Sequence, residues 1–264
     1  MSIPRILIIA GSDSGGGAGI QADIRTVTML GGHATTAITA ITAQNTLGVT
    51  AIHPVPVEIV LAQIDAVTSD IGCDAVKIGM IGSAEIAHAV ADRLEALDCP
   101  IVFDPVMIAT SGSVLADPET IVAFERLMTI ASVVTPNLPE LTALGGRQAV
   151  LAYGCHLAEK GGHKEGPTIL DQLYAPKDRL VMEIEAERID TPDTHGTGCT
   201  FAAALATGLG SGLSIGEAFI QAVRFVRLAI LNAPGLGEGH GPVGHALGMV
   251  PFDVVDGEGE DDDA

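Results

Sequence analysis

The sequence predicts an α/β fold in which helices cover both faces of a mostly parallel sheet. Short apolar runs alternate with segments of helical periodicity along most of the chain, which indicates right-handed β-α-β crossovers. Apolar residues make up 47% of the 264 residues, whereas aromatic residues make up 3% and Trp is absent. The core must therefore be built from Ala, Val, Ile and Leu, which suits helices packed on a parallel sheet.

The first half of the chain supplies four of the predicted strands. The apolar run 5–10 ends at a glycine-rich turn, and a helix then continues to about residue 30. Residues 34–43 are rich in Thr and Ile and predict a second strand, and apolar spacing predicts a helix over 57–67. Two further strands are predicted over 74–78 and 99–104, separated by a helix that Ser83 can cap.

The second half continues the alternation and then departs from it. A helix over 118–129 and a strand over 132–134 are followed by residues 168–187, which predict two strands joined by residues 175–178. We expect this hairpin at the edge of the sheet. Helices that begin at Thr197 and Ser214 complete the chain. No internal repeat or linker is visible, so we expect a single domain over residues 1–250.

Charge and cysteine content exclude several classes of function. The formal net charge of −20 argues against a nucleic-acid partner, whose phosphates would repel the chain. Residues 253–263 hold seven acidic and no basic residues, so we expect residues 251–264 to be a solvated, disordered tail. The four cysteines show neither a CxxC pair nor zinc spacing. The N-terminal apolar run is too short for a signal peptide or a membrane span, which predicts a soluble cytoplasmic protein without a membrane partner.

Ligands of open α/β sheets bind beyond the carboxyl ends of the strands, so we expect the ligand-binding residues in the turns there. The turn Gly11–Gly19 lacks the Lys and Ser/Thr of a phosphate-binding P-loop. Residues 17–22 fit the loose GxGxxA dinucleotide pattern, but residues 42–45 lack the acid that this pattern requires at the end of the second strand. Four glycines within five positions favour close approach of the backbone to a flat ligand over a simple tight turn.

Two side chains near this turn suit a heterocyclic ligand. The amide of Gln44 can donate and accept in one plane, which matches the edge of a heterocycle, although a solvent-facing loop glutamine fits equally well. Asp23, on the first helix, can accept an N–H from the same ligand, or it is an ordinary surface charge.

The turns after the later strands carry acids and an amide. Asp104 ends one strand, and Asn137 and Glu140 lie at the next strand-helix turn. Magnesium is commonly held by one or two carboxylates together with phosphates and waters, so Asp104 and Glu140 are candidate ligands. The alternative is that either acid caps a helix. The small-residue loop 109–113 is a candidate lid.

The last two motifs suit phosphate and proton transfer. Lys160 precedes two glycines and suits phosphate contact, although a lone lysine is often a surface charge. The turn Gly196–Cys199 opens an Ala-rich helix, whose first N–H groups favour anions. A helix N-terminus lowers a thiol pKa, which would make Cys199 a candidate base at neutral pH. The alternative is a small buried cysteine.

Seven motifs follow one another in the order found in a known family. They are residues 10–23, 39–46, 77–80, 104–106, 135–140, 160–163 and 195–199. Together they resemble the ribokinase-like superfamily, and within it the hydroxymethylpyrimidine/phosphomethylpyrimidine kinases of thiamin biosynthesis. The resemblance covers residues 5 to about 245. Most of the superfamily has Asp at the position of Cys199, and the Cys form is typical of the pyrimidine kinases and some pyridoxal kinases.

This resemblance implies a three-layer αβα sandwich and a pair of ATP-dependent reactions that use Mg²⁺. The first phosphorylates 4-amino-5-hydroxymethyl-2-methylpyrimidine and the second phosphorylates its monophosphate. The implied substrate-binding residues are Gly11, Ala18, Asp23, Gln44, Met80 and Val106. The implied ATP-binding residues are Asn137, Lys160, Thr197 and Gly198, and the implied catalytic residues are Lys160, Gly196, Gly198 and Cys199. A homodimer is also implied.

Two alternatives and two departures accompany the resemblance. A pyridoxal or pyridoxine kinase of the same fold, and a small-molecule binding protein without catalysis, remain open. The intact phosphate-binding residues speak against the second alternative, because a binder has no need of them. Only 19 residues separate Glu140 from Lys160, fewer than is usual in the family, so we expect one short helix there. The acidic tail has no counterpart in the family.

Overall fold

The computed structural model describes residues 2–109, 112–163 and 166–247, and these form an α/β sandwich around one sheet. The strands of the described chain are β1 (Arg5–Asp13), β2 (His33–Asn45), β3 (Gly48–Pro54), β4 (Ala75–Ile78), β5 (Ile101–Phe103), β6 (Val133–Val134), β7 (His156–Glu159), β8 (Thr168–Ala175) and β9 (Arg179–Glu187). Their order across the sheet is β3-β2-β1-β4-β5-β6-β7-β8-β9. The six strands from β2 to β7 in this order are parallel, and the predicted α/β class is confirmed.

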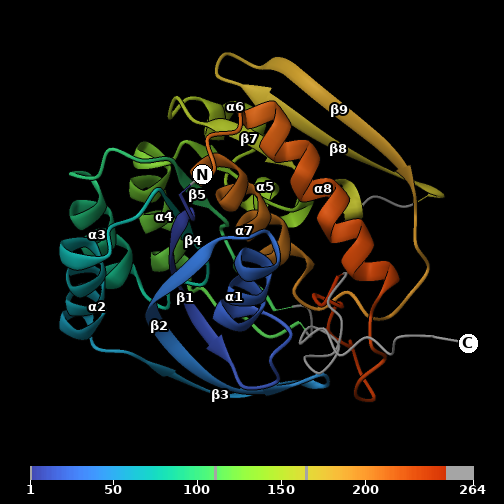
Figure 1. Cartoon of the computed structure of the whole chain (residues 1–264), viewed down its shortest axis with the longest axis horizontal. Helices are drawn as coiled ribbons and strands as arrows, with labels where there is room; N and C mark the ends of the chain where they lie inside the picture. The colour runs from blue at the N-terminus through green and yellow to red at the C-terminus, as the bar shows by residue number, and fades with distance from the viewer. Residues whose placement is uncertain (1, 110–111, 164–165, 248–264) are drawn as a thin grey trace, which may run out of the picture.

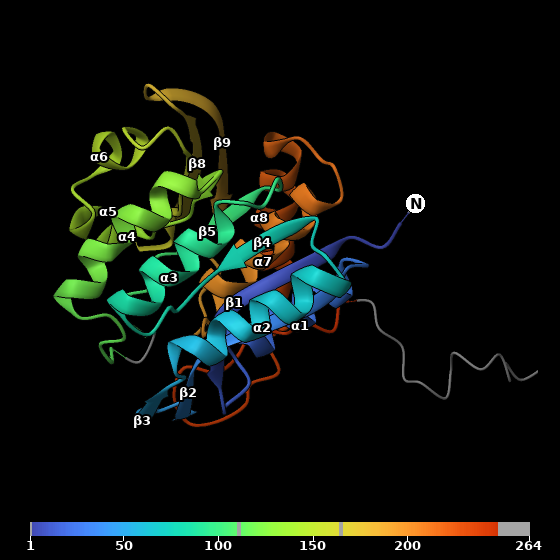
Figure 2. The ribbon, with the colours of Figure 1, turned by 90° about the vertical axis from the view of Figure 1, so that its left-hand side faces the viewer.

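Helices cover the two faces of the sheet unequally. Their bounds are α1 (Gly19–Met29), α2 (Val57–Asp70), α3 (Ala84–Leu94), α4 (Pro118–Ile130), α5 (Leu138–Ala143), α6 (Arg147–Leu151), α7 (Thr197–Gly210) and α8 (Ile215–Leu231). Helices α1, α7 and α8 share one buried cluster with the sheet, and α2 to α6 share the other. Figure 1 shows the sheet between these groups, and Figure 2 shows α2, α3 and α4 on its near side.

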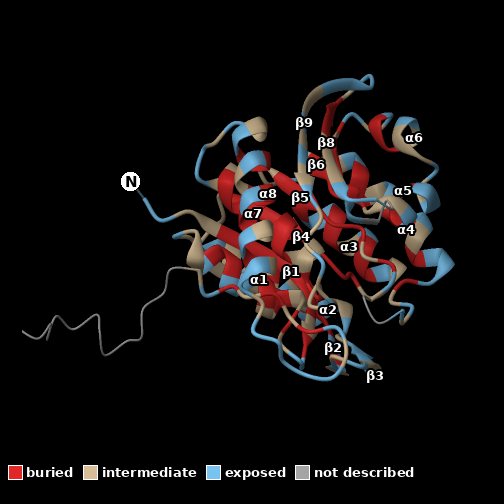
Figure 3. Ribbon diagram, turned by 90° about the vertical axis from the view of Figure 1, so that its right-hand side faces the viewer, coloured by how far each residue is buried: buried red, intermediate tan, exposed pale blue. Residues whose placement is uncertain are grey.

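Strand β1 shows why both faces must be covered. Its side chains alternate between the two clusters: Ile6 and Ile8 face α7 and α8, whereas Leu7 and Ile9 face the α2 to α6 layer. All four are fully buried. A strand that is apolar on both sides is stable only beneath helices on both sides. Figure 3 colours much of the central sheet as buried.

Helix α7 lies against the middle of the sheet, and it is built from small residues for that reason. Its residues Thr200–Gly208 are buried without interruption, because α1, α8 and the sheet surround it. The alanines 202–204 and Ala206 let these neighbours approach closely. Small side chains at these positions thus allow α7 to pack closely between its neighbours.

Both edges of the sheet are antiparallel hairpins, whereas the sequence predicted only one. The predicted hairpin is present as β8 and β9, and its turn places Lys177 and Asp178 at positive φ. The missed strand is β3, which pairs antiparallel with β2 at the opposite edge. Residues 50–54 of β3 are exposed and give no alternation of buried and exposed positions, so sequence periodicity could not reveal them.

The remaining expectations concern the segment before Lys160, the membrane and the tail. Two helices of 6 and 5 residues, α5 and α6, occupy the segment expected to hold one short helix. Within the ranges described above, no helix is long and apolar enough to cross a bilayer. The predicted domain boundary at residue 250 and the acidic tail 251–264 lie outside the described residues.

The first testable prediction concerns the core between β5 and α4. Phe103 and Phe124 meet edge to face, with ring centroids 5.2 Å apart, and both are buried. We expect Phe124→Ala to lower the free energy of unfolding by about 3–5 kcal/mol, because it opens a cavity beneath the sheet. Val122, on the same helix, is 66% exposed, so Val122→Ala should change stability by about 0.5 kcal/mol or less. Urea denaturation of both variants measures this, and equal losses would contradict the packing described.

Candidate active site

Two glycine-containing turns interlock at the carboxyl end of the sheet. One follows β1, and the other precedes α7. A Cβ on Gly17 would lie 2.5 Å from Cδ2 of His195, and a Cβ on Gly196 would overlap the carbonyl oxygen of Gly17. Gly196 also has a φ of 85°, a conformation that other residues seldom adopt. Both positions therefore require glycine, and their contact sets where α7 begins.

The carboxylate of Asp13 organises the first of these turns. It accepts backbone N–H bonds from Gly15, Gly17 and Ala18 at 2.8–3.1 Å, and it lies 2.9 Å from Nε2 of His195. Burial raises the pKa of Asp13, but the bonds from His195 and from the Ala18 and Gly15 backbone outweigh it, so the pKa is lowered. Asp13 thus remains ionised and joins the two turns.

Asp13 and His195 did not emerge as site residues from the sequence. An acid just before a glycine run is a signal in itself, because Asp side chains commonly bond backbone N–H groups two residues further on. The bond between Asp13 and the N–H of Gly15 is of this kind. The contact with His195 spans 182 residues, so no local pattern could have revealed it.

The predicted substrate residues lie around this junction. Nε2 of Gln44 is 3.0 Å from Nε2 of His195, and the Gln44 backbone exchanges two hydrogen bonds with the Ser14 hydroxyl. Met80 packs against Gly11, where a Cβ would lie 3.0 Å from the Met80 sulfur. The structure therefore gathers Gln44, Gly11, Met80 and Ala18 at the carboxyl ends of β1, β2 and β4.

A second polar cluster lies at the ends of β5, β6 and β7. Lys160 Nζ is 2.9 Å from Oδ1 of Asp104, and the Thr135 hydroxyl donates to the same oxygen at 2.9 Å. Asn137 and Glu140 form a capping box at the start of α5, so the helix-capping alternative describes Glu140 but not Asp104. Lys160 pairs with Asn137 in an isolated bridge, which fixes the lysine beside this helix start.

Burial and proximity set the charges of this cluster. Burial raises the pKa of Glu140 to about 7, and Asp104 adds to the rise while Lys160 opposes it. Burial lowers the pKa of Lys160, but Asp104 and Glu140 outweigh it, so the pKa is raised. The lysine therefore stays charged. Near neutral pH, Glu140 beside it is only partly ionised.

The N-terminus of α7 faces this second cluster. A Cβ on Gly198 would lie 3.3 Å from Lys160 Nζ and 3.5 Å from Oδ2 of Asp104. Gly198 is the second residue of α7, where backbone N–H groups lack partners within the helix. The start of one helix therefore links the glycine turns, where a ring could bind, to a lysine suited to phosphates.

Cys199 does not have the low pKa that its place at a helix N-terminus predicted. Burial raises the pKa of its thiol to about 11; Lys77 opposes the rise, whereas Asp23 and Asp104 add to it. The prediction of a thiolate at neutral pH is wrong for this structure. The helix N-terminus is visible in the sequence, whereas desolvation and the two nearby carboxylates, which raise the pKa of Cys199, arise only in the folded structure.

Asp23 is neither exposed nor on the surface. Its Oδ2 lies 2.7 Å from Nζ of Lys77, and both side chains have no exposed area. Burial raises the pKa of Asp23 to about 6, although Lys77 opposes the shift. Its Oδ1 is buried without a hydrogen-bond partner among the described residues. The surface alternative is therefore wrong, and the carboxylate faces Lys77.

Comparison with known proteins identifies the family. A family model described as phosphomethylpyrimidine kinase matches residues 13–244. The chain belongs to the phosphomethylpyrimidine kinase family. A protein of Rhizobium meliloti (strain 1021), named hydroxymethylpyrimidine/phosphomethylpyrimidine kinase, is 47% identical over 256 residues, which cover 90% of this chain and 96% of the relative.

Solved structures agree on the fold but span two kinds of kinase. A phosphomethylpyrimidine kinase from Clostridium difficile 630 superposes with a TM-score of 0.74 and 35% identity, over 87% of this chain and 100% of the other. A pyridoxal kinase from Staphylococcus aureus in complex with AMP-PCP and pyridoxal has a TM-score of 0.83 and 32% identity, over 93% and 94%. The predicted ribokinase-like fold and the kinase class are confirmed.

Two further predicted features of this phosphomethylpyrimidine kinase family member lie after β5. The backbone N–H of Val106 donates to the carbonyl of Asp104 at 2.8 Å, which holds the loop start close to the second cluster. In the candidate lid, residues 109–113, the Ala109 N–H donates to the Ser113 carbonyl at 2.8 Å, and this hydrogen bond joins the two ends of the loop. Residues 110 and 111 lie outside the described part, and the lid remains a prediction.

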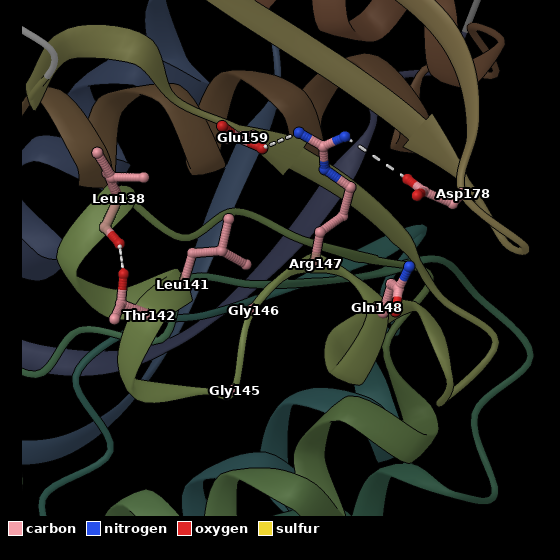
Figure 4. A pocket seen from close by; sticks show the side chains of 9 residues that line it. All are labelled: Leu138, Leu141, Thr142, Gly145, Gly146, Arg147, Gln148, Glu159 and Asp178. Carbon is pink, nitrogen blue, oxygen red and sulfur yellow. Dashed lines mark hydrogen bonds and ion pairs between the residues drawn. The ribbon is translucent and has the colours of Figure 1, made fainter.

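An open pocket beside α5 and α6 is lined by Leu138 and Glu159, which adjoin Asn137 and Lys160 in the chain. Figure 4 shows Arg147 between Glu159 and Asp178, the acids that it contacts at 2.9 and 3.6 Å. The guanidinium also stacks on the Tyr174 ring at 3.8 Å. These contacts tie α6 and β7 to the β8–β9 hairpin, so Arg147 supports the sheet edge.

The second testable prediction uses the pKa of Glu140. Because this pKa is raised above its unfolded value, Glu140 favours the folded state below about pH 4.5 and loses that contribution as pH rises through about 7. The free energy of unfolding of the wild-type protein should fall between pH 5 and pH 8. We expect a smaller fall in Glu140→Gln, since Gln keeps the capping acceptor without the charge. Urea denaturation at several pH values measures this free energy. Glu119→Gln, at an exposed position of α4, is the control and should leave the fall unchanged.

Proposed function

We propose that this chain transfers the γ-phosphoryl group of ATP to the hydroxymethyl group of 4-amino-5-hydroxymethyl-2-methylpyrimidine, and then to the resulting monophosphate. Membership of the phosphomethylpyrimidine kinase family supports this substrate. The structural observation that carries the proposal is the start of α7. It contacts the glycine turn beside Gln44 on one side and Lys160 on the other.

On the substrate side, the pyrimidine would lie on the backbone around Gly11 and Ala18. Gln44 would exchange its contact with His195 for hydrogen bonds to the ring edge, while Met80 and Val106 would supply apolar surface. Asp23 was predicted to accept a ring N–H, but its Oδ2 is bonded to Lys77. Because the Asp23 side chain has no exposed area, we propose that it takes part through the position of Lys77.

On the nucleotide side, Lys160 would contact the phosphates together with the backbone N–H groups of Thr197 and Gly198. Asn137 lies next to Lys160 in the sheet bridge and would border the same phosphates. Phosphoryl transfer passes through a loose transition state, so positioning and charge neutralisation account for most of the catalysis. A charged lysine opposite a helix N-terminus supplies both.

Magnesium fits the second cluster by its donor chemistry. Asp104 and Glu140 provide carboxylate oxygens, which suit this hard cation, and Lys160 is their shared positive partner. Burial, together with Asp104, raises the pKa of Glu140 to about 7, and a bound cation would favour its ionised form. Bound Mg²⁺ would neutralise phosphate charge, and Asp104 and Glu140 are the residues that would hold it.

In the transfer itself, the substrate oxygen forms a bond to the γ-phosphorus while the bond to the β–γ bridging oxygen breaks. The N–H groups of Gly196, Thr197 and Gly198 would stabilise the moving phosphoryl group, and Lys160 would share its charge. The hydroxyl proton must leave, and Cys199 is the proposed acceptor. Because the Cys199 thiol is neutral before substrate binds, it would first have to release its own proton to solvent, and the resulting thiolate would then take the hydroxyl proton.

A pyridoxal kinase is the second candidate, and one observation favours it. The pyridoxal kinase structure superposes with a TM-score of 0.83, against 0.74 for the phosphomethylpyrimidine kinase. Both substrates carry a hydroxymethyl group on a flat ring, so backbone similarity alone does not separate them. The sequence relative at 47% identity favours the pyrimidine. A homodimer and a cytoplasmic location remain proposals from the family resemblance.

The third testable prediction separates these substrates. We expect the purified chain with ATP and Mg²⁺ to phosphorylate the hydroxymethylpyrimidine and its monophosphate with a higher kcat/KM than pyridoxal. An ATP-consumption assay with the three substrates in parallel measures this. Lys160→Met should lower kcat by about 10²–10³-fold, since it removes the positive charge that is proposed to stabilise the transferring phosphoryl group.

A substitution at an exposed lysine serves as the matched control. Lys177→Met, on the exposed hairpin turn, should keep full turnover. Faster turnover of pyridoxal would select the second candidate. No turnover with any of the substrates would contradict a kinase and favour the non-catalytic binding protein.

The fourth testable prediction concerns Cys199 as the base. With a pKa of about 11, the thiolate fraction rises tenfold per pH unit below that value, so kcat should rise between pH 6 and pH 9. Cys199→Ala should lower kcat by about 10²–10⁴-fold with little change in KM. Cys199→Asp, the residue of most of the superfamily, should retain more activity and flatten the pH profile. Wild-type turnover in Cys199→Ala would eliminate the base role.

A further inference from the structure

We propose that Cys73 and Cys99 form a redox-sensitive pair, which a small-molecule disulfide converts into an intramolecular disulfide between the amino ends of β4 and β5. The two sulfur atoms lie 3.8 Å apart, and both side chains are partly buried. This proposal does not depend on the kinase reaction. The pair lies before the strands, whereas the candidate active site lies after their carboxyl ends.

The sheet holds the two cysteines in register. Cys73 precedes β4 and Cys99 precedes β5, and these adjacent parallel strands pair Val76 with Ile101. The Val76 N–H donates to the carbonyl of Pro100, the residue after Cys99, at 2.9 Å. A disulfide has a sulfur separation of about 2.05 Å, so bond formation requires sulfur movement of only about 2 Å.

Arg5 fixes the segment that carries Cys73. Its guanidinium makes two bonds to the carboxylate of Asp74, at 2.6 and 3.0 Å, and another to the carbonyl of Ile71 at 2.6 Å. Pro100 restricts the backbone next to Cys99. Both thiols are therefore placed before any oxidant arrives, and little entropy is lost when they join.

The surroundings make the two thiols unequal. The bond to Cys99 lowers the pKa of Cys73; burial and Asp74 oppose this, and Arg5 adds to it. The same bond raises the pKa of Cys99, and burial, Asp74 and Asp98 add to the rise. Arg5 favours the thiolate of Cys73, whereas Asp98 disfavours that of Cys99, so Cys73 is the proposed first nucleophile in disulfide exchange.

The exchange balances with oxidised glutathione as the oxidant. The Cys73 thiolate attacks one sulfur of glutathione disulfide, which forms a mixed disulfide and releases one glutathione thiolate. Cys99 then loses its proton to solvent and attacks the Cys73 sulfur, and the second glutathione leaves. Two cysteine thiols are oxidised to one disulfide, and one glutathione disulfide is reduced to two glutathione thiols.

The bond would have a measurable consequence for stability. It would cross-link residues 26 positions apart and enclose α3 in a covalent loop. Such a loop restricts the unfolded chain, so Tm should rise by roughly 5–10 °C. Because the linked ends lie opposite the candidate active site, kinase turnover should not change.

The fifth testable prediction is that treatment of the full chain with oxidised glutathione links Cys73 to Cys99. We expect the thiol count of the denatured protein to fall from four to two. After blocking of the remaining thiols and digestion with trypsin without reductant, mass spectrometry should find peptide 26–77 joined to peptide 94–126. Dithiothreitol should separate the peptides and return Tm to its starting value.

Single substitutions provide the controls. Cys155→Ser removes a buried cysteine whose thiol donates to the Val150 carbonyl, and it should still form the linked peptides. Cys73→Ser and Cys99→Ser should each abolish the link and the rise in Tm. Glutathione on individual cysteines without linked peptides would overturn the proposal, and so would loss of two thiols in Cys73→Ser.

Discussion

The contact between two backbone turns determines the geometry of the whole site. Where Gly17 meets Gly196, neither position has room for a Cβ, and the carboxylate of Asp13 bonds both turns. This contact places the first turn of α7 at the carboxyl end of β1. The sheet, α1 and α8 pack around the helix and bury its residues Thr200–Gly208. A helix N-terminus that is held so firmly can act as a preorganised anion site, which needs no rearrangement during transfer.

Charge at the site depends on burial as much as on partners. Two lysines each face a carboxylate, Lys77 opposite Asp23 and Lys160 opposite Asp104, and these pairs surround the thiol of Cys199. Burial penalises every charge among them, so further charges survive only with compensation. The thiol stays protonated for this reason. An arriving nucleotide would add negative phosphates to the same space, so Lys160 is the charge best placed to meet them.

Local patterns predicted much of the fold and of the site, and their failures have two physical causes. The strand-helix alternation and the glycine turns follow short-range rules, so residues such as Gly196 and Lys160 stood out in the sequence. The missed edge strand β3 is mostly exposed and carries no periodic pattern. The pKa of Cys199 and the burial of Asp23 depend on residues that lie far away in the chain. Only the folded structure brings such residues together.

Backbone similarity does not distinguish the two candidate substrates. A pyridoxal kinase superposes better than a phosphomethylpyrimidine kinase, although the family model and the 47% identical relative belong to the pyrimidine enzymes. Backbone similarity reports the sandwich and the start of α7, which both kinases need for phosphoryl transfer. Discrimination between two flat rings must come from side chains at the ring edge, because hydrogen-bond patterns differ there while shape does not. Gln44 is the residue proposed for that position, and its partner His195 is held by the same Asp13 that joins the two turns. The proposed substrate contact of Gln44 and the start of α7 are thus linked through one carboxylate.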